Sequence, residues 1–166
     1  MGKIKNIVNN NIFKYILTVI IVLLMFVLSV WVTGGKINNY IDIPTLLFVG
    51  ILPYCIMWVS FGDSKTKKII SAPFTKNIDD GILNESLLFF KMLNKMIWCS
   101  TLFVMIINVI NMLLTYGGIT SSGLDYKILF ILTLISPLYA LLINLIFIIP
   151  YTVFIKRKLN NFGLKE

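Results

Sequence analysis

Histidine is absent from this 166-residue sequence, and acidic residues are scarce, with seven Asp and Glu against fifteen Lys and Arg. Without histidine, neither a histidine-ligated metal site nor a histidine-based catalytic triad can form. None of the acidic residues falls inside a long apolar stretch, which excludes the intramembrane carboxylate of an ordinary proton relay. No Gly-rich phosphate loop and no convergent cluster of Cys or acidic residues is present either, so we predict no catalytic residue, no metal and no cofactor, and we expect no enzyme.

Charge of either sign is also rare, at 13% of the chain against roughly 25% in soluble domains. The charged residues are clustered, which leaves four uncharged stretches of at least 20 residues, enough for a helix to cross a bilayer. The first stretch is too long for a signal peptide and lacks a small-residue cleavage site, so we expect it to be retained. The sequence predicts an all-α integral membrane protein with a single membrane domain, 1–166, whose four spans lie at about 13–32, 43–61, 94–115 and 127–154.

The distribution of lysine and arginine predicts the orientation of these spans. The two tails and the segment between the second and third spans carry thirteen basic residues, whereas the other two loops carry only Lys36 and Lys127. The positive-inside rule then predicts that both termini and the segment 63–93 are cytoplasmic. The net charge of +8 therefore reflects topology and not nucleic-acid binding, and we expect anionic lipid headgroups to be the partners of these lysines.

An amphipathic helix is predicted within the short cytoplasmic segment, at about 80–95. Asp79 and Asp80 suit a helix start, where acidic groups meet the positive end of the helix dipole. From there Leu83, Leu87 and Phe90 recur at helical spacing. We expect this helix to continue directly into the third span.

Prolines and a few polar residues interrupt the apolar spans. Pro44 lies near the start of the second span, where its missing N–H costs nothing, and Pro137 and Pro150 lie within the fourth span. Polar side chains in hydrocarbon either face a wet path or hydrogen-bond between packed helices. The residues alone favour the packing role but leave both open for Thr101, Asn108, Thr133, Ser136 and Asn144.

Four segments of the chain share a pattern with one known family. They are residues 40–49 (YIDIPTLLFV), 89–93 (FFKML), 110–113 (INML) and 136–150 (SPLYALLINLIFIIP). In this order they resemble the IDIPSLL-V, FFK-L, I-HML and T-LYGALLANL-FLP segments of the MotA branch of the MotA/TolQ/ExbB family. The four segments are spread from residue 40 to residue 150 and include Asn144 and Pro150.

This resemblance implies a bacterial cytoplasmic (inner) membrane protein that forms a ring of five copies around two single-span partners of the MotB/ExbD kind. The third and fourth spans would form the inner wall, and the partner would supply the ion-binding Asp. Ser136 falls where the family has a channel Thr. The residues that would line the channel are Thr101, Met105, Asn108, Thr133 and Ser136, and those with a structural role are Pro44, Pro137, Asn144 and Pro150.

The sequence also departs from the family. Val104 and Met105 stand where the family has Gly-Thr, and Asn108 stands where it has Gly, although Thr101 lies one turn earlier. The cytoplasmic segment, 63–95, is too short to hold the rotor-contacting domain of a flagellar stator. The chain is therefore not an ordinary flagellar stator subunit.

The leading hypothesis is a MotA-like homopentameric ring subunit of an ion-driven membrane motor or channel, coupled to protons or sodium. One alternative, indicated by Met105 and the short cytoplasmic segment, is a structural or degenerate MotA-like oligomer that does not conduct. The other is an unrelated four-span accessory protein, such as a transporter subunit or an assembly factor. A neighbouring gene that encodes a single-span protein with an intramembrane Asp would favour the first hypothesis.

The predicted topology can be tested with a reporter that is active only in the cytoplasm. Fusion after Glu166 or near Lys68 is expected to give signal, because the positive-inside rule places both positions inside the cell. Fusions within the loops at 36–40 or 119–123 are expected to be silent. A signal from either of these loops would contradict the four-span topology.

Overall fold

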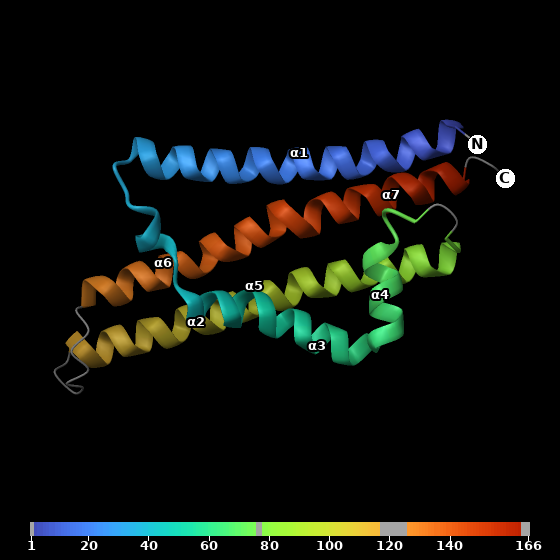
Figure 1. The fold of residues 1–166 in the computed structure, drawn as a ribbon. Coiled ribbons are helices and arrows are strands. Elements are labelled where there is room, and N and C mark those ends of the chain that lie inside the picture. Colours follow the sequence, from blue (N-terminus) through green and yellow to red (C-terminus); the bar gives the residue numbers. More distant parts are fainter. Residues whose placement is uncertain (1, 76–77, 117–125, 164–166) are drawn as a thin grey trace.

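The computed structural model describes the backbone of residues 2–75, 78–116 and 126–163, and the side chains of 12–75, 78–115 and 128–160. Over these ranges the chain is helical apart from short connections, and they contain no strand. Figure 1 shows the long helices running roughly side by side. The elements in chain order are α1 (Gly2–Val32), η1 (Ile37–Tyr40), α2 (Ile43–Leu46), η2 (Leu47–Ile51), α3 (Leu52–Phe61), α4 (Asp63–Ser71), α5 (Asp80–Tyr116), α6 (Tyr126–Ile143), η3 (Asn144–Ile148) and α7 (Ile149–Gly163).

Four helical segments of the described chain are long and apolar enough to cross a membrane. Their bounds are Ile12–Val32, Ile43–Phe61, Asp80–Thr115 and Ile128–Asn160. The predicted all-α class is therefore confirmed over the described residues, as is the prediction of four helices long and apolar enough to span a membrane. The second span combines α2, η2 and α3, and the fourth combines α6, η3 and α7.

The amphipathic segment and the third span form a single helix, α5, which begins at Asp80. Its apolar positions Leu83, Phe90 and Leu93 are buried, whereas Lys91 and Lys95 are exposed. The apolar stripe of this first part of α5 is therefore covered by other segments of the same chain, and its lysines remain free to reach water.

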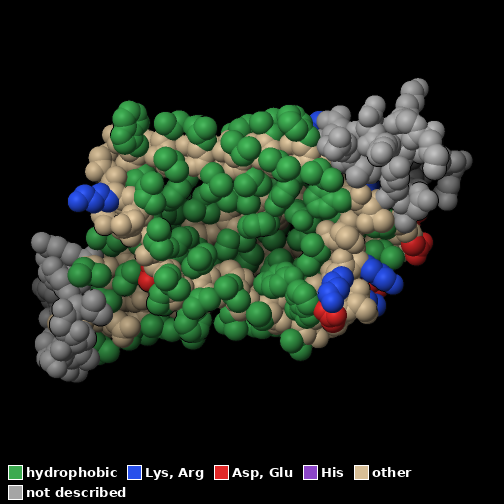
Figure 2. Space-filling view, viewed as in Figure 1, with side chains coloured by type: hydrophobic (Ala, Val, Ile, Leu, Met, Phe, Trp, Pro, Cys, Tyr) green, Lys and Arg blue, Asp and Glu red, His purple; other side chains and the backbone are tan. Residues whose placement is uncertain are grey.

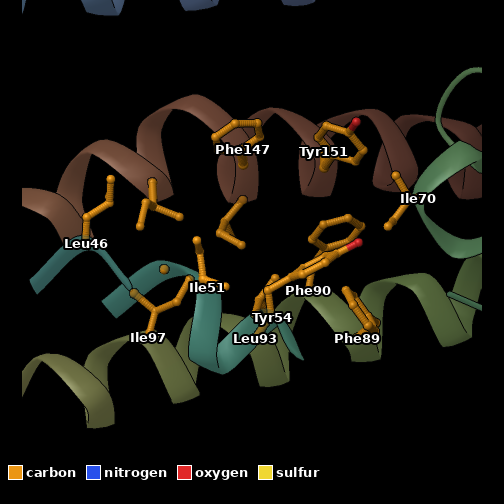
Figure 3. A pocket seen from close by; sticks show the side chains of 13 residues that line it. Leu46, Ile51, Tyr54, Ile70, Phe89, Phe90, Leu93, Ile97, Phe147 and Tyr151 are labelled. Atoms are coloured by element: carbon orange, nitrogen blue, oxygen red, sulfur yellow. The ribbon is translucent and has the colours of Figure 1, made fainter. Parts of the chain in front are cut away.

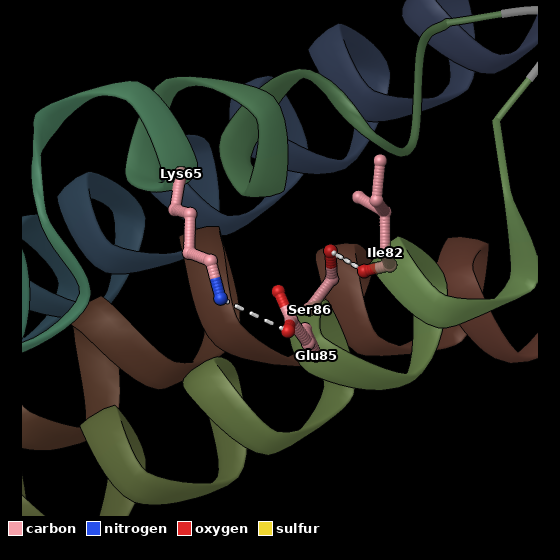
Figure 4. A network of polar contacts seen from close by, with 4 residues as sticks. All are labelled: Lys65, Ile82, Glu85 and Ser86. Atoms are coloured by element: carbon pink, nitrogen blue, oxygen red, sulfur yellow. Dashed lines mark hydrogen bonds and ion pairs between the residues drawn. The ribbon is translucent and has the colours of Figure 1, made fainter.

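Helix α4 covers part of the apolar stripe at the start of α5. It is a short amphipathic helix that the sequence analysis did not separate from the rest of the segment 63–93. Ile69 and Thr66 face inward and are buried. On its rim, the Lys65 ammonium lies 3.1 Å from the Glu85 carboxylate of α5, next to Ser86, whose hydroxyl donates to the Ile82 carbonyl (Figure 4). Both charged side chains are about half exposed, so burial of the apolar face contributes more to docking α4 than this ion pair does.

Two prolines explain why the second and fourth spans are not regular α-helices. A π-helical turn precedes each of them, with η2 ending two residues before Pro53 and η3 ending two residues before Pro150. Proline has no N–H and its ring clashes with the carbonyl four residues earlier, so the preceding turn widens. The N–H of Leu52 then donates to the Leu47 carbonyl, and that of Ile149 to the Asn144 carbonyl.

Charged side chains lie toward the ends of the molecule. Figure 1 places α4, the start of α5 and the two chain termini at one end, and Figure 2 shows hydrophobic side chains over the middle of the visible face. We call the end that holds α4 and the chain termini the basic end. Its basic residues come from α4 and α7 and are Lys65, Lys67, Lys68, Lys156, Arg157 and Lys158.

Helix α1 is exposed along most of its length, and three edge-on aromatic pairs join it to other segments. Near the basic end, Tyr15 packs edge-on against Tyr151 and Phe74, at centroid distances of 5.5 and 6.0 Å. Toward the opposite end, Phe26 packs edge-on against Tyr40 at 6.0 Å. These contacts, together with the buried Val30, fix the position of α1 on the bundle.

The ammonium group of Lys158 on α7 hydrogen-bonds to the connection that follows α4. The Lys158 Nζ donates to the carbonyl oxygens of Ala72 and Thr75, both at 2.6 Å, and Ala72 is fully buried. These carbonyls follow the end of α4, where the helix supplies them with no further N–H. A lysine at this position therefore caps α4 from a distant helix.

Replacing Lys158 with Met is expected to lower the stability of the folded protein by about 1–3 kcal/mol, because the apolar stem is kept while two charged hydrogen bonds are lost. Thermal unfolding of the detergent-solubilised protein measures the effect. Lys156→Met is the matched control, since Lys156 is exposed on the same helix. Equal unfolding temperatures for the two variants would show that Lys158 does not fasten α4.

Candidate functional site

The hydroxyl groups predicted to line a channel lie inside the single chain. Thr101 of α5 and Thr133 and Ser136 of α6 are buried, with exposures of 1%, 7% and 0%. Each donates a hydrogen bond to a carbonyl of its own helix: Thr101 to Ile97 at 2.8 Å, Thr133 to Leu129 at 2.8 Å and Ser136 to Thr133 at 3.0 Å. Their polarity is thus satisfied without water or an ion.

This placement bears on the two roles that the sequence left open. A lumen enclosed by several copies is lined by side chains that one copy leaves exposed, and these three hydroxyls are not among them. Small polar side chains that satisfy themselves allow helices to approach closely in an apolar medium. In the single chain, Thr101, Thr133 and Ser136 therefore serve the packing of α5 and α6.

Met105 and Asn108 lie nearer the surface on the same helix. Both are half-buried, one and two turns after Thr101. The Asn108 Nδ2 is buried, and no group of the described chain accepts its hydrogen bond. A buried amide donor without an acceptor is uncommon in a finished structure. Of the predicted channel residues, Asn108 is the one with unused hydrogen-bonding capacity.

The residues predicted to be structural occupy the irregular parts of the second and fourth spans. Pro44 is exposed in the first turn of α2, where the Asp42 carboxylate accepts a hydrogen bond from the Thr45 N–H at 3.3 Å. Asn144 begins η3, is buried, and donates from Nδ2 to the Ala140 carbonyl at 2.9 Å. Pro150 is buried just after η3, and Pro137 is half-buried inside α6.

A tyrosine that the sequence analysis did not single out joins two of the family-like segments. The Tyr139 hydroxyl donates to the Tyr40 carbonyl at 2.7 Å and accepts from the Asp42 N–H at 2.6 Å. Tyr139 lies on α6 and is 8% exposed, so its phenol needs such partners. We call this pair of bonds the Tyr139 clamp. It holds the connection between α1 and α2 against the last third of α6.

Beyond the clamp, α5 and α6 continue as a two-helix hairpin. Tyr139 is the fourteenth residue of α6, which puts the clamp about 20 Å from the start of that helix at 1.5 Å per residue. The hairpin exposes apolar side chains from both of its helices, each between 39% and 61% exposed: Leu102, Phe103, Ile106, Ile107, Val109, Ile110 and Leu113 of α5, and Ile128, Phe130, Ile131 and Leu134 of α6. This surface requires lipid or other protein chains to cover it.

The described residues hold no group of three or more His, Cys, Asp or Glu side chains that could bind a metal ion. Comparisons with protein-family models, with curated proteins and with solved structures gave no match in any of the three. Membership of the MotA/TolQ/ExbB family therefore stays a prediction that rests on the sequence segments alone.

The Tyr139 clamp can be tested by removing its hydroxyl. Tyr139→Phe is expected to destabilise the protein by roughly 1–2 kcal/mol, because two backbone groups lose their partner in a part-buried site. Thermal unfolding in detergent measures this loss. Tyr40→Phe is the control, since the clamp uses only the backbone of Tyr40 and the ring contact with Phe26 is kept. If both variants unfold like the parent protein, the clamp does not contribute to stability.

Proposed function

We propose that the chain is a MotA-like subunit that forms a pentameric ring in the bacterial cytoplasmic membrane and works there in an ion-driven motor or channel, coupled to protons or sodium. The ring encloses a single-span partner of the MotB/ExbD kind, which supplies the ion-binding Asp. The observation that carries this proposal is the hairpin of α5 and α6. Its outer surface is apolar, and the buried hydroxyls of Thr101 and Thr133 form hydrogen bonds with carbonyls of their own helices.

The hairpin supports a ring because α1 and α2 do not cover it beyond the Tyr139 clamp. Copies that pack through two different faces of such a hairpin either close into a ring or grow without end. The lumen would then be formed by α5 and α6, as the resemblance implies, with Met105 and Asn108 closer to it than Thr101, Thr133 and Ser136. Five copies is the number that the resemblance implies.

The chemistry of the spans supports a partner that brings its own carboxylate. No Asp or Glu lies within 43–62, 96–124 or 128–155, so the chain has no acid of its own to bind and release an ion there. The basic end faces the cytoplasm in this proposal, in keeping with the positive-inside rule.

A second candidate is the non-conducting oligomer. The observation that favours it is the complete burial of Ser136, whose hydroxyl bonds to its own helix where the family has a channel Thr. A lumen lined mainly by Ile, Leu and Met resists wetting and does not pass ions. The two candidates share the ring and differ in whether a partner makes it conduct.

Native mass measurement of the purified protein, together with ion flux into liposomes, tests both parts of the proposal. We expect a mass of five copies, and flux only when the single-span partner is co-reconstituted, because a dry apolar lumen blocks ions. A monomer or dimer would contradict the ring. Strong flux from the ring alone would contradict the need for an outside carboxylate, and a ring without flux in either state would favour the non-conducting oligomer.

Two tryptophan variants locate the interface between copies. Ile106→Trp on the hairpin is expected to break the ring, because the added bulk must fit between rigid helices. Ile20→Trp on α1 is the control, since that residue is similarly exposed, at 51% against 57%, and fluid lipid accommodates bulk. Native mass measurement of both variants decides the matter. If Ile20→Trp breaks the ring and Ile106→Trp does not, α1 and not the hairpin forms the contact.

A further inference from the structure

A groove of about 380 Å³ lies between α1 and α7, toward the end of the molecule where both chain termini lie (Figure 1). One face of each helix lines it, with residues 14, 17 and 18 from α1 and residues between Ile149 and Arg157 from α7. At 1.5 Å per residue the α7 wall is about 12 Å long. Tyr15 and Tyr151, which follow lining residues in the two helices, pack edge-on at 5.5 Å and hold the walls together.

The body of the groove is apolar and open to the surroundings of the helices. Pro150 and Phe154 are buried in it, whereas Leu17 and Val153 are 44% and 39% exposed. Both walls belong to segments that are long and apolar enough to cross a membrane. The groove therefore offers an apolar surface to whatever surrounds the first and fourth spans.

Two basic side chains also line the groove, one from each helix. Lys14 lies one turn before Thr18 in α1, and Arg157 lies one turn after Val153 in α7. The two helices run in opposite directions, so both basic residues lie at the same end of the groove (Figure 1). Each also lies close to an end of its span, where long basic side chains reach the headgroup region of a bilayer.

No carboxylate of the described chain is paired with these two residues. Neither Lys14 nor Arg157 forms an ion pair there, and no Asp or Glu is among the described residues that line the groove. Lys65 of α4 differs, because its ammonium is paired with the Glu85 carboxylate. The groove thus combines an apolar surface with two cations that have no partner among the described residues.

A larger apolar cavity, of about 440 Å³ between the second, third and fourth spans, lacks this combination (Figure 3). Its lining includes Gly50, Phe89 and Phe147 but, among the described residues, no Lys, Arg, Asp or Glu. A cavity that offers only apolar contacts does not discriminate a lipid chain from an apolar side chain. The two cations of the groove do discriminate, because they favour an occupant that is apolar along its length and anionic at one end.

We propose that the groove between α1 and α7 binds an anionic phospholipid. One acyl chain lies along Leu17 and Val153, and the phosphate lies between Lys14 and Arg157. The Arg157 guanidinium donates two parallel hydrogen bonds to phosphate oxygens, and the Lys14 ammonium adds a second positive charge. Each basic residue near an anionic lipid strengthens binding roughly fivefold, whereas a zwitterionic headgroup brings its own cation and gains less. The site requires neither the ring nor ion conduction.

Photo-crosslinking in vesicles tests the headgroup preference. The purified full-length chain is reconstituted in phosphatidylcholine with a trace of phosphatidylglycerol that carries a diazirine on one acyl chain, then irradiated, digested and analysed by mass spectrometry. The measured quantity is labelling of 14–18 and 149–157 divided by labelling of 20–28, a mostly exposed part of α1. This ratio is expected to be several-fold higher than with the same diazirine chain on phosphatidylcholine. Equal ratios for the two lipids would overturn the proposal.

Two double variants separate the groove from the general positive charge of the molecule. Lys14→Gln with Arg157→Gln is expected to lower the phosphatidylglycerol ratio to the phosphatidylcholine value, because both charges that select the lipid are gone. Lys91→Gln with Lys156→Gln is the matched control, since it removes two charges from exposed residues that do not line the groove. An equal fall in both double variants would overturn the proposal.

A pair of adjacent tryptophan variants tests the apolar part of the site. Leu17→Trp fills the groove and is expected to lower the phosphatidylglycerol ratio several-fold with both cations still present. Ile16→Trp is the control, because Ile16 is 50% exposed on the same helix and does not line the groove. If the two variants give the same ratio, the lipid chain does not lie in the groove and the proposal is wrong.

Discussion

The structure is governed by the requirement that polar groups in an apolar medium find partners within the chain. No water is available in the hydrocarbon core, so each unpaired N–H, carbonyl or hydroxyl there costs several kcal/mol. The hydroxyls of Thr101, Thr133 and Ser136 meet this requirement by bonding to their own helices. Tyr139 meets it by bonding to a connection almost a hundred residues away, and so joins α6 to the region between α1 and α2.

The same requirement connects the two prolines to the cavity. Because Pro53 and Pro150 offer no N–H, the turns before them widen, and the N–H groups of Leu52 and Ile149 bond one residue further back. Residues of both widened turns line one apolar cavity between the second, third and fourth spans. A Cβ at Gly50 of the first widened turn would come within 3.1 Å of the Ile143 Cδ1, so the second and fourth spans are in close contact there.

The coarse fold could be predicted from the sequence because it depends on the lengths of uncharged stretches, and these leave little choice in a bilayer. The Tyr139 clamp could not, since a tyrosine inside an apolar span carries no sign of which distant backbone group it will meet. Helix α4 was missed because nine residues rich in lysine resemble a polar loop until Ile69 and Thr66 are seen against α5. Likewise, the sequence shows that Ser136 is polar and in a span, but not which side of α6 faces a neighbouring helix.

The sparse contacts of α1 have a consequence for how the molecule comes together. Its surface is mostly exposed, and its contacts with the rest include three aromatic pairs of Tyr15 and Phe26 and the buried Val30. The core residues from Val49 to Ile155 pack among themselves without a contribution from α1. A helix attached in this way forms a separate cooperative unit, which can come away from the bundle while the remaining spans keep their structure. Within this chain α1 is synthesised well before Tyr151, so the contact between Tyr15 and Tyr151 can form only after that part of the fourth span has been made.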